Sequence, residues 1–414
     1  MNVEVVAVGT ELLLGQIVNG NAAEIGRRLA EAGLDHYHQV VVGDNLGRVA
    51  AALTQAAGRS DAVIVTGGVG PTQDDLTREA VCAAAGVGMA YSEEMAAHLR
   101  DLWARRRGRE MPASNLRQAE YPEGAVFLPN ARGTAPGLRL RMGSAWVFAL
   151  PGVPQEMLPM LEEQVIPFLV AEAGGGGVLV SRLVRCWGES ESGIAERLGD
   201  LYEASTNPTV AFLASAGEIK VRLTARADTV DEAAALLDPL EAEVCRRLDR
   251  WVFAVGEETI ERIVLRLCRE RGWTLGTAES ATGGMVAERL TSVPGASEVF
   301  VGSVVAYTPA VKTALLGVPP GVMEEEGVVS EVTALAMAEG GAARLGADVV
   351  VAVTGSAGPE AGGAPVGTMV VAVRTPEGAS ARTFHMPADR ERARTLTSTG
   401  ALQAVRRALT GEWW

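Results

Sequence analysis

Two periods of apolar residues alternate along the first third of the chain. Short runs rich in β-branched residues separate longer Ala- and Leu-rich segments, in which apolar residues recur with the spacing of a helical turn. The first pattern is typical of buried strands and the second of amphipathic helices. The order predicts a parallel sheet with helices on both faces and ligands at the carboxyl ends of the strands. The expected strands are 3–8, 37–42 and 61–66, and the expected helices are 21–32, 46–58 and 75–85.

The pattern changes at Gly174, where a run of four glycines follows a helix that ends near Ala173. Such a run cannot continue a helix and indicates a linker. A strand, a helix, two strands and a helix are expected next, at 178–187, 191–203, 209–214, 218–227 and 230–248. This order predicts a small open α+β sheet with its helices on one side.

From about residue 257 the alternation of helices and strands resumes. The expected helices are 258–271, 283–291, 309–316, 331–345 and 389–410, and the expected strands are 273–278, 299–306, 347–353, 367–374 and 380–386. The two α/β parts share no motif spacing, so an internal repeat is excluded. We expect three domains, at 1–173, 174–255 and 256–414.

Composition narrows the class of protein. A chain of 414 residues exceeds one ordinary hydrophobic core, which supports more than one domain. A net charge of −14 repels phosphate backbones and argues against nucleic acid as a partner. The four cysteines form no Cys-x-x-Cys pair, and neither a leader peptide nor an apolar run of about 18 residues is evident. These features predict a cytoplasmic protein without a membrane span.

A serine and a lysine suggest nucleophilic chemistry in the last third. Ser280 follows an expected strand and precedes Thr282, Gly283 and Gly284 at the start of a helix. Backbone N–H groups there can hold an oxyanion or a phosphate, although a serine at this place is often only a helix N-cap. Lys312 lies on a short helix behind an apolar strand, where burial would lower the pKa of its amine; a surface lysine is the alternative.

Two further positions accompany this pair. Tyr307 can hydrogen-bond the serine and lysine or a substrate amide, or it can fill the core at the end of a strand. Thr354 and Gly355 end another expected strand, and their loop either lines the same pocket or forms a tight turn. These alternatives stay open at this point.

The N-terminal part has a glycine-rich turn after its third strand. The run Thr66–Asp75 lets backbone approach a phosphate at Gly67, Gly68 and Gly70, and it is neither a Walker A nor a dinucleotide fingerprint. Polar residues from several strand ends converge on the same edge, which favours a ligand site. The candidate binding residues are Glu11, Asn21, Asp44, Gly67, Gly68, Gly70, Pro71 and Thr72. Asp74 and Asp75 are candidate ligands for a divalent ion, with helix capping as the alternative.

Several long motifs resemble those of the CinA family. The C-terminal part resembles its nicotinamide-nucleotide amidohydrolase domain through AESATGG at 278–284, VTGSAGP at 353–359 and PVGT at 365–368. The N-terminal part resembles the family's other module through VGTELLLG at 8–15 and TGGVGPTQDD at 66–75. The matches run in family order over nearly the whole chain.

The resemblance implies an amidohydrolase in the C-terminal part, which converts nicotinamide mononucleotide and water to nicotinate mononucleotide and ammonia without a cofactor. Ser280, Lys312 and Tyr307 would be catalytic. The implied substrate-binding residues are Thr282, Gly283, Gly284, Thr354, Gly355 and Arg394, of which Arg394 would recognise the 5′-phosphate. In this family the residue after the serine is commonly cysteine, and here it is Ala281, so the chain either uses Ser280 or has lost the activity. For Arg390 and Arg392 a solvated helix face is expected.

For the remaining parts, the resemblance implies a three-layer molybdopterin-binding-like domain of the MoaB/MogA kind. It is associated with ADP-ribose pyrophosphatase activity that depends on a divalent ion such as Mg²⁺, with a monovalent cation as a further candidate. The middle domain is KH-like but lacks the Gly-x-x-Gly clamp, so we expect a spacer or oligomerisation domain. A homodimer is expected. The alternatives are a competence- or DNA-damage-associated protein with silent nucleotide-binding domains, and a molybdopterin-type binding protein without hydrolysis.

Overall fold

The computed structural model describes residues 1–107, 111–174, 177–215, 217–359, 363–387 and 389–413. The chain divides into two compact units, Met1–Val180 with Ala225–Ala235 and Ser181–Thr224 with Leu236–Trp414. Gly175 and Gly176 of the expected linker lie outside the described residues.

The N-terminal unit is built on a six-stranded sheet in the order β2-β1-β3-β8-β7-β6. The first four strands are parallel, β7 is antiparallel to β8, and β6 is antiparallel to β7. Their bounds are β1 Val3–Val8, β2 Gln39–Val42, β3 Ala62–Thr66, β6 Val126–Leu128, β7 Gly137–Met142 and β8 Ala145–Leu150. The sheet is therefore mixed and not fully parallel as expected, because β6, β7 and β8 follow one another along the chain as antiparallel neighbours.

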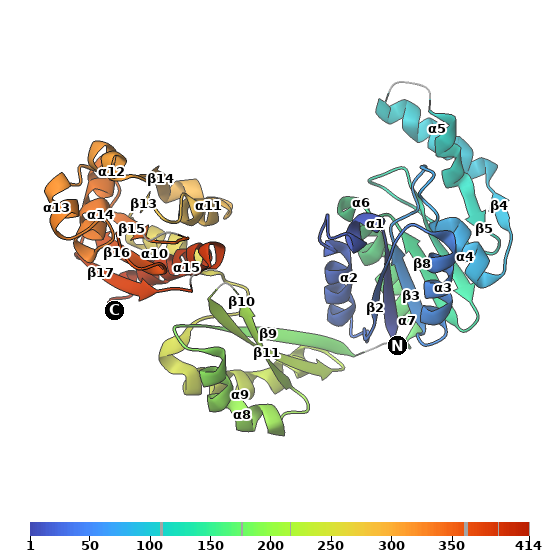
Figure 1. Cartoon of the computed structure of the whole chain (residues 1–414). Helices are drawn as coiled ribbons and strands as arrows, with labels where there is room; N and C mark the ends of the chain where they lie inside the picture. The colour runs from blue at the N-terminus through green and yellow to red at the C-terminus, as the bar shows by residue number, and fades with distance from the viewer. Residues whose placement is uncertain (108–110, 175–176, 216, 360–362, 388, 414) are drawn as a thin grey trace. The chain divides into compact units, whose positions relative to one another are not determined.

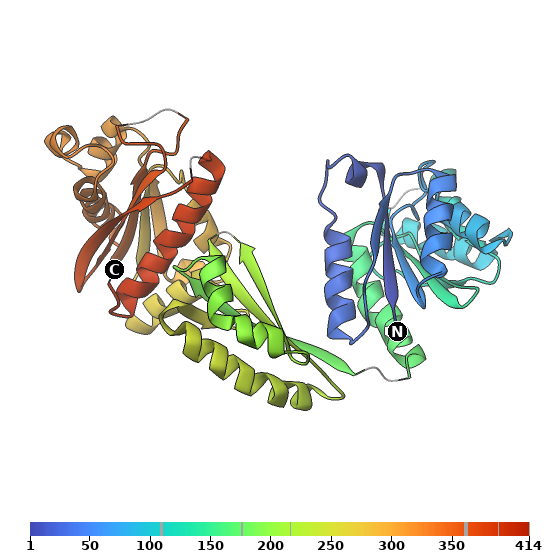
Figure 2. The same ribbon diagram turned by 60° about the horizontal axis from the view of Figure 1, so that its bottom comes forward.

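Alternate residues of the central strands face two separate cores. Val3 and Val5 of β1 pack with α2 (Gly20–Glu31), α6 (Pro154–Met160) and α7 (Ile166–Glu172). Val6 and Val8 pack with α3 (Leu46–Ala57) and α4 (Thr77–Ala85) on the other face. Figure 1 shows these helices on both faces of the sheet, and Figure 2 shows the same layers from a second side. The predicted three-layer arrangement is confirmed.

The remaining elements of this unit lie around the sheet. They are α1 (Thr10–Leu13), β4 (Met89–Tyr91), α5 (Glu93–Arg107), the 3-10 helix Ala113–Ala119, β5 (Glu120–Pro122) and the π-helix Leu161–Val165 between α6 and α7. β4 and β5 pair antiparallel as a separate two-stranded sheet.

The middle segment forms a four-stranded sheet in the order β10-β11-β9-β12. Its elements are β9 Val178–Trp187, α8 Glu191–Ala204, β10 Thr209–Ser215, β11 Glu218–Ala227, α9 Val230–Leu248 and β12 Val252–Val255. The expected β-α-β-β-α order is confirmed. The sequence pattern did not predict β12, a short strand that pairs antiparallel with β9.

The C-terminal segment has a five-stranded sheet in the order β14-β13-β15-β16-β17. β13 pairs parallel with both β14 and β15, and β16 and β17 are antiparallel. The strand bounds are β13 Leu275–Glu279, β14 Phe300–Val305, β15 Val349–Gly355, β16 Thr368–Thr375 and β17 Gly378–His385.

Helices cover both faces of this sheet as well. α10 (Ile260–Arg271), α11 (Met285–Thr291) and α15 (Arg390–Leu409) share one core with odd-numbered residues of β15, such as Val351. α12 (Pro309–Leu316), α13 (Pro320–Glu325) and α14 (Glu331–Leu345) pack on the other face, against even-numbered residues such as Val350. The expected helices and strands are present here, with ends shifted by a few residues.

Candidate functional site

The C-terminal site is centred on Ser280 and Lys312. Ser280 directly follows β13, and its backbone N–H donates to the carbonyl of Val353 in the neighbouring strand β15 (2.9 Å). Lys312 points back from α12 with a fully buried side chain, and its Nζ lies 2.7 Å from Ser280 Oγ and 3.0 Å from the carbonyl oxygen of Ala306. The structure therefore brings the predicted serine and lysine into direct hydrogen-bond contact.

Burial changes the proton affinity of the lysine. Desolvation lowers the pKa of Lys312 from 10.5 to about 8, because the charged ammonium loses its water. Among the described residues, no carboxylate forms an ion pair with this amine. A neutral amine at this position is therefore accessible near physiological pH, which is what a general base for the serine requires.

Tyr307 approaches the pair with its backbone rather than its ring. Its carbonyl oxygen is 3.4 Å from Ser280 Oγ, whereas the side chain is 56% exposed. The phenol oxygen accepts a hydrogen bond from Arg390 Nη2 (2.8 Å). The ring does not fill the core, which removes that alternative, and the phenol lies in the cavity lining.

The two arginines at the start of α15 have different environments. Arg390 lines the cavity and also donates to the carbonyl of Gly358 (2.8 Å). Arg394, one helical turn later, donates to the carbonyls of Ala281 (3.1 Å) and Thr282 (2.9 Å) behind the serine. Arg390 is exposed, as expected of a solvated helix face, but it also lines the cavity, whereas Arg394 is outside the lining.

A buried carboxylate, that of Glu279, binds the backbone N–H groups at the start of the helix that follows the serine. Glu279 is fully buried, and its oxygens accept from the N–H groups of Gly284 (2.9 Å), Val286 (3.1 Å) and Ala287 (2.9 Å). The N–H groups at the start of α11 are thus taken, and the expectation that they hold an oxyanion is corrected. The sequence signal for this role was a glutamate directly before the serine and the Gly-Gly pair.

The turn between Ser280 and α11 contributes further groups. Gly283 and Gly284 have φ angles of 61° and 97°, which glycine tolerates best. Thr282 is fully buried, and its hydroxyl has no hydrogen-bond partner among the described residues. Thr354 lines the cavity beside Gly355, with its hydroxyl donating to the carbonyl of Val328 (3.0 Å).

The cavity itself has a volume of about 510 Å³. Ser280 and Lys312 line it together with Tyr307, Arg390 and the loop after β15. Of the predicted substrate-binding residues, Thr354 and Gly355 line it, whereas Thr282, Gly283, Gly284 and Arg394 lie outside the lining.

The second site is a cavity of about 400 Å³ at the carboxyl ends of β1, β3 and β8. Eight residues predicted from sequence line it: Glu11, Asp44, Gly67, Gly68, Gly70, Pro71, Asp74 and Asp75. Asn21 and Thr72 do not. Asn21 instead donates to Thr66 Oγ1 (3.1 Å) and to the carbonyl of Gly152 (2.7 Å), which joins the loops after β3 and β8.

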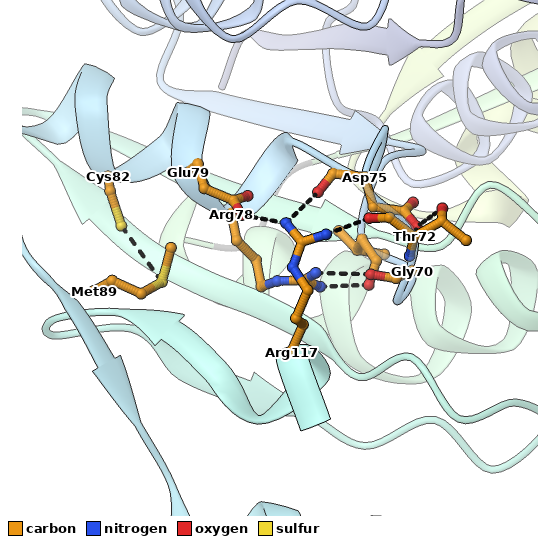
Figure 3. Close-up of polar contacts among 9 residues, drawn as sticks. Gly70, Thr72, Asp75, Arg78, Glu79, Cys82, Met89 and Arg117 are labelled. Atoms are coloured by element: carbon orange, nitrogen blue, oxygen red, sulfur yellow. Dashed lines mark hydrogen bonds and ion pairs between the residues drawn. The ribbon is translucent and has the colours of Figure 1, made fainter. Parts of the chain in front are cut away.

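Two arginines that sequence reasoning did not consider hold the glycine-rich loop. Arg78 of α4 is only 2% exposed and donates to the carbonyls of Val69 (2.5 Å) and Gly70 (2.7 Å). Arg117 donates to the carbonyl of Thr72 and to Glu79 (2.6 Å), as Figure 3 shows. Burial lowers the pKa of Arg78, and its Nε has no partner among the described residues. The loop is thus held by hydrogen bonds from two arginines, of which Arg78 is buried and Arg117 half-buried.

The lining carboxylates are partly committed to this architecture. One oxygen of Asp75 accepts from the N–H (2.8 Å) and the hydroxyl (2.5 Å) of Thr72, a contact inside the loop, whereas the N-cap of α4 is Leu76 and has no side-chain hydrogen bond. A hydrogen bond from Thr72 lowers the pKa of Asp74, and Asp44 accepts from the N–H of Thr10 (2.8 Å). Among the described residues no three His, Cys, Asp or Glu side chains gather closely enough to hold a metal ion. A divalent ion at this site would therefore take one or two ligands from the lining carboxylates and the others from oxygens of the substrate.

No helix in the described part of the chain is long and apolar enough to cross a membrane. The four cysteines, Cys82, Cys186, Cys245 and Cys268, are free thiols.

Three family models match successive parts of the chain. They are described as "Probable molybdopterin binding domain" over residues 4–171, "Damage-inducible protein CinA KH domain" over 181–254 and "CinA C-terminal domain" over 257–409. The solved structure of the protein CinA of unknown function from Thermoplasma acidophilum is 35% identical, with a TM-score of 0.38, and covers 40% of this chain and 97% of its own.

Curated relatives match over the full length. A CinA-like protein of Frankia casuarinae is 46% identical in an alignment of 419 positions, which covers 99% of this chain and 97% of the relative. A CinA-like protein of Parasynechococcus marenigrum is also 46% identical and covers 99% of both chains. The chain belongs to the CinA family.

Proposed function

We propose that the C-terminal part hydrolyses the carboxamide of nicotinamide mononucleotide to nicotinate mononucleotide and ammonia. The observation that carries the proposal is the 2.7 Å contact between Ser280 Oγ and the buried amine of Lys312. With a pKa of about 8, the amine is neutral in about one enzyme molecule in ten at pH 7. A charged lysine donates to the serine oxygen, and a neutral one accepts the serine proton.

The reaction then runs in two balanced steps. Ser280 Oγ forms a bond to the carboxamide carbon while its proton passes to Lys312 Nζ. That proton next goes to the amide nitrogen, the C–N bond breaks, and ammonia leaves an acyl-serine. Water gives up a proton to the neutral lysine and attacks the ester; that proton then passes to Ser280 Oγ as the ester C–O bond breaks, and the acid released ionises to the carboxylate. The N–H groups of Ala281 and Thr282 are our candidates for stabilising the oxyanion, since Glu279 occupies the N–H groups further along.

Arg390 is suited to bind the 5′-phosphate of this substrate. Its guanidinium lies in the cavity lining and is exposed, and the phenol of Tyr307 and the carbonyl of Gly358 hold its orientation. An arginine matches a phosphate with two parallel hydrogen bonds. The Arg394 guanidinium already donates to two carbonyls of the serine turn, so in this proposal it supports the turn.

The N-terminal part in this proposal is a pyrophosphatase that acts on ADP-ribose. Its cavity combines the loop Gly67–Gly70 with carboxylates at the strand ends. The loop N–H groups bind phosphate oxygens, and Asp74, with Asp44 or Asp75, would hold a divalent ion that neutralises the pyrophosphate. The alternative of competence- or damage-associated binding without turnover is supported by the family description of the middle segment as damage-inducible.

Ammonia release from nicotinamide mononucleotide tests the leading proposal. The wild-type protein should release ammonia, and Ser280→Ala and Lys312→Ala should each lower kcat by at least about 100-fold, the range found for loss of a nucleophile or a general base. Thermal unfolding of each variant serves as the control for folding. Variants that match the wild-type rate would rule out the serine–lysine mechanism, and a wild type that releases no ammonia would favour the binding alternative.

A further inference from the structure

In the N-terminal unit a second cavity, of about 390 Å³, adjoins the first, which is the cavity of about 400 Å³ lined by Asp74 and Asp75. Its walls come from α5, from β6 and from the loop that joins β6 to β7. The two cavities share Thr134 in their linings. None of the expected site residues lies in this second cavity, and the function proposed above does not use it.

The wall between the two cavities is a turn held by one side chain. Asn130 Oδ1 accepts from the N–H groups of Arg132 (3.0 Å) and Gly133 (2.8 Å). Its Nδ2 donates to the carbonyl of Ala135 (2.8 Å) and to Glu156 Oε2 (2.7 Å). Because Asn130 lines the second cavity and Glu156 lines the first, this hydrogen bond joins the two linings directly.

The two linings differ sharply in charge. Five carboxylates and the glycine-rich loop surround the first cavity. The second has one carboxylate, Glu94, and a largely apolar wall that includes Met95, Leu102, Val126 and Phe127. A phosphate with its counter-ion is stabilised in the first environment, whereas an uncharged, flat ring is stabilised in the second.

We propose that the second cavity binds the uncharged nucleoside end of a nucleotide whose pyrophosphate occupies the first. The inference rests on the pyrophosphatase function proposed above. Met95, Phe127, Ser92 and His98 line this cavity. In the proposal the first two side chains pack against the base, and the last two hydrogen-bond its edge or the ribose hydroxyls. Two adjoining cavities of about 400 and 390 Å³, one charged and one apolar, match the two chemical halves of a dinucleotide-like substrate.

Calorimetric titration of the full chain in the presence of Mg²⁺ tests this division. ADP-ribose and inorganic pyrophosphate are the two probes. Val126→Asp places a charge in the apolar wall at a half-exposed position, and His98→Ala removes a polar group from an exposed position on α5. We expect Val126→Asp to weaken ADP-ribose binding by at least about tenfold and His98→Ala by a smaller factor, with pyrophosphate binding changed by less than about twofold.

Arg100→Ala is the matched control, because Arg100 lies on α5, is exposed and is outside both linings. If Val126→Asp and His98→Ala both bind ADP-ribose as the wild type does, the proposed subsite is wrong, whereas the proposed pyrophosphatase function is unaffected. Wild-type protein that binds neither probe would overturn both. A change of oligomeric state in sedimentation, with ADP-ribose binding intact, would assign the apolar wall to an interface between copies and also overturn the inference.

Discussion

At the scale of single residues, the scarcity of lysine is informative. The chain has 37 basic residues, and only Lys220 and Lys312 among them are lysines. Lys312 is fully buried beside the serine, where an arginine would keep its proton at every physiological pH. An amine whose pKa lies near 8 can release it. The chemistry of the site therefore explains why lysine stands at this position.

Lys312→Arg keeps a positive charge but removes the base, so kcat for ammonia release should fall by about 100-fold or more. Lys220→Arg, the same change at the other lysine, should be silent. In the wild type the rate should rise with pH through about 8 as Lys312 loses its proton, and then level off. Ammonia release measured between pH 6 and 10 checks both, and an active Lys312→Arg enzyme with the same pH profile would contradict the role.

The same lowered pKa affects stability. Because the unfolded chain binds the Lys312 proton more tightly than the folded one, burial costs free energy of folding below pH 8. This cost diminishes as the pH rises from about 8 towards 10.5, so the sign is opposite to that of an ordinary surface lysine in an ion pair.

Arg390→Ala tests which arginine recognises the phosphate. Loss of a charged hydrogen-bond donor should raise KM for nicotinamide mononucleotide by about tenfold or more, with a much smaller change in kcat. Arg394→Ala should act mainly on kcat, since Arg394 supports the carbonyls of the serine turn. Nicotinamide riboside, which lacks the phosphate, is the comparison substrate. If Arg390→Ala slows both substrates equally, Arg390 does not read the phosphate.

At the scale of elements, Glu279 couples the strand that delivers the serine to the helix that follows. Its carboxylate accepts hydrogen bonds from three N–H groups at the start of α11. Hydrogen bonds to a carboxylate are stronger than those between neutral groups. Glu279→Gln replaces one acceptor oxygen by a donor, so we expect a loss of about 2–4 kcal/mol in the free energy of unfolding. Urea denaturation measures it. Glu288→Gln, at an exposed position in α11, is the control and should change stability little; equal effects would argue against the special role of Glu279.

Sequence periodicity identified most helices and strands of the stretches 3–85 and 178–410, but between them only a helix ending near Ala173 was expected. β7 and β8 were missed although both carry a strand signal, since apolar and basic residues alternate in β7 (GLRLRM) and β8 is a run of six apolar residues (AWVFAL). β6 has only three residues, too few for a period to develop. The choice between Arg390 and Arg394 depends on where α15 begins. With Asp389 as its N-cap, Arg390 falls in the first turn beside the loop after β15, and Arg394 one turn further along. Residues four apart share a helix face, so spacing alone could not separate them.

The same limit applies to the N-terminal loop. The glycines and carboxylates of Thr66–Asp75 were recognisable because a glycine-rich turn after a buried strand has a local signature. The support from the buried Arg78 and the half-buried Arg117 was not, because an arginine on a helix is exposed in most proteins and only the fold shows which carbonyls it reaches.

At the scale of the whole molecule, each candidate site is built from one unit alone. The cavity with Ser280 takes all its lining from the second unit, and the cavity with Asp74 takes all of its lining from the first. We therefore expect two separable activities.

Ser280→Ala should abolish ammonia release and change the hydrolysis of ADP-ribose by less than about twofold. Asp74→Asn should leave ammonia release unchanged and lower the rate of ADP-ribose hydrolysis by at least about tenfold. Both reactions measured on the same preparations of full-length protein, with the double variant as a third sample, check this expectation. Ser280→Ala would slow ADP-ribose hydrolysis only if the two sites are energetically coupled. A variant that slows this reaction while its thermal unfolding matches the wild type would therefore contradict the independence of the two units.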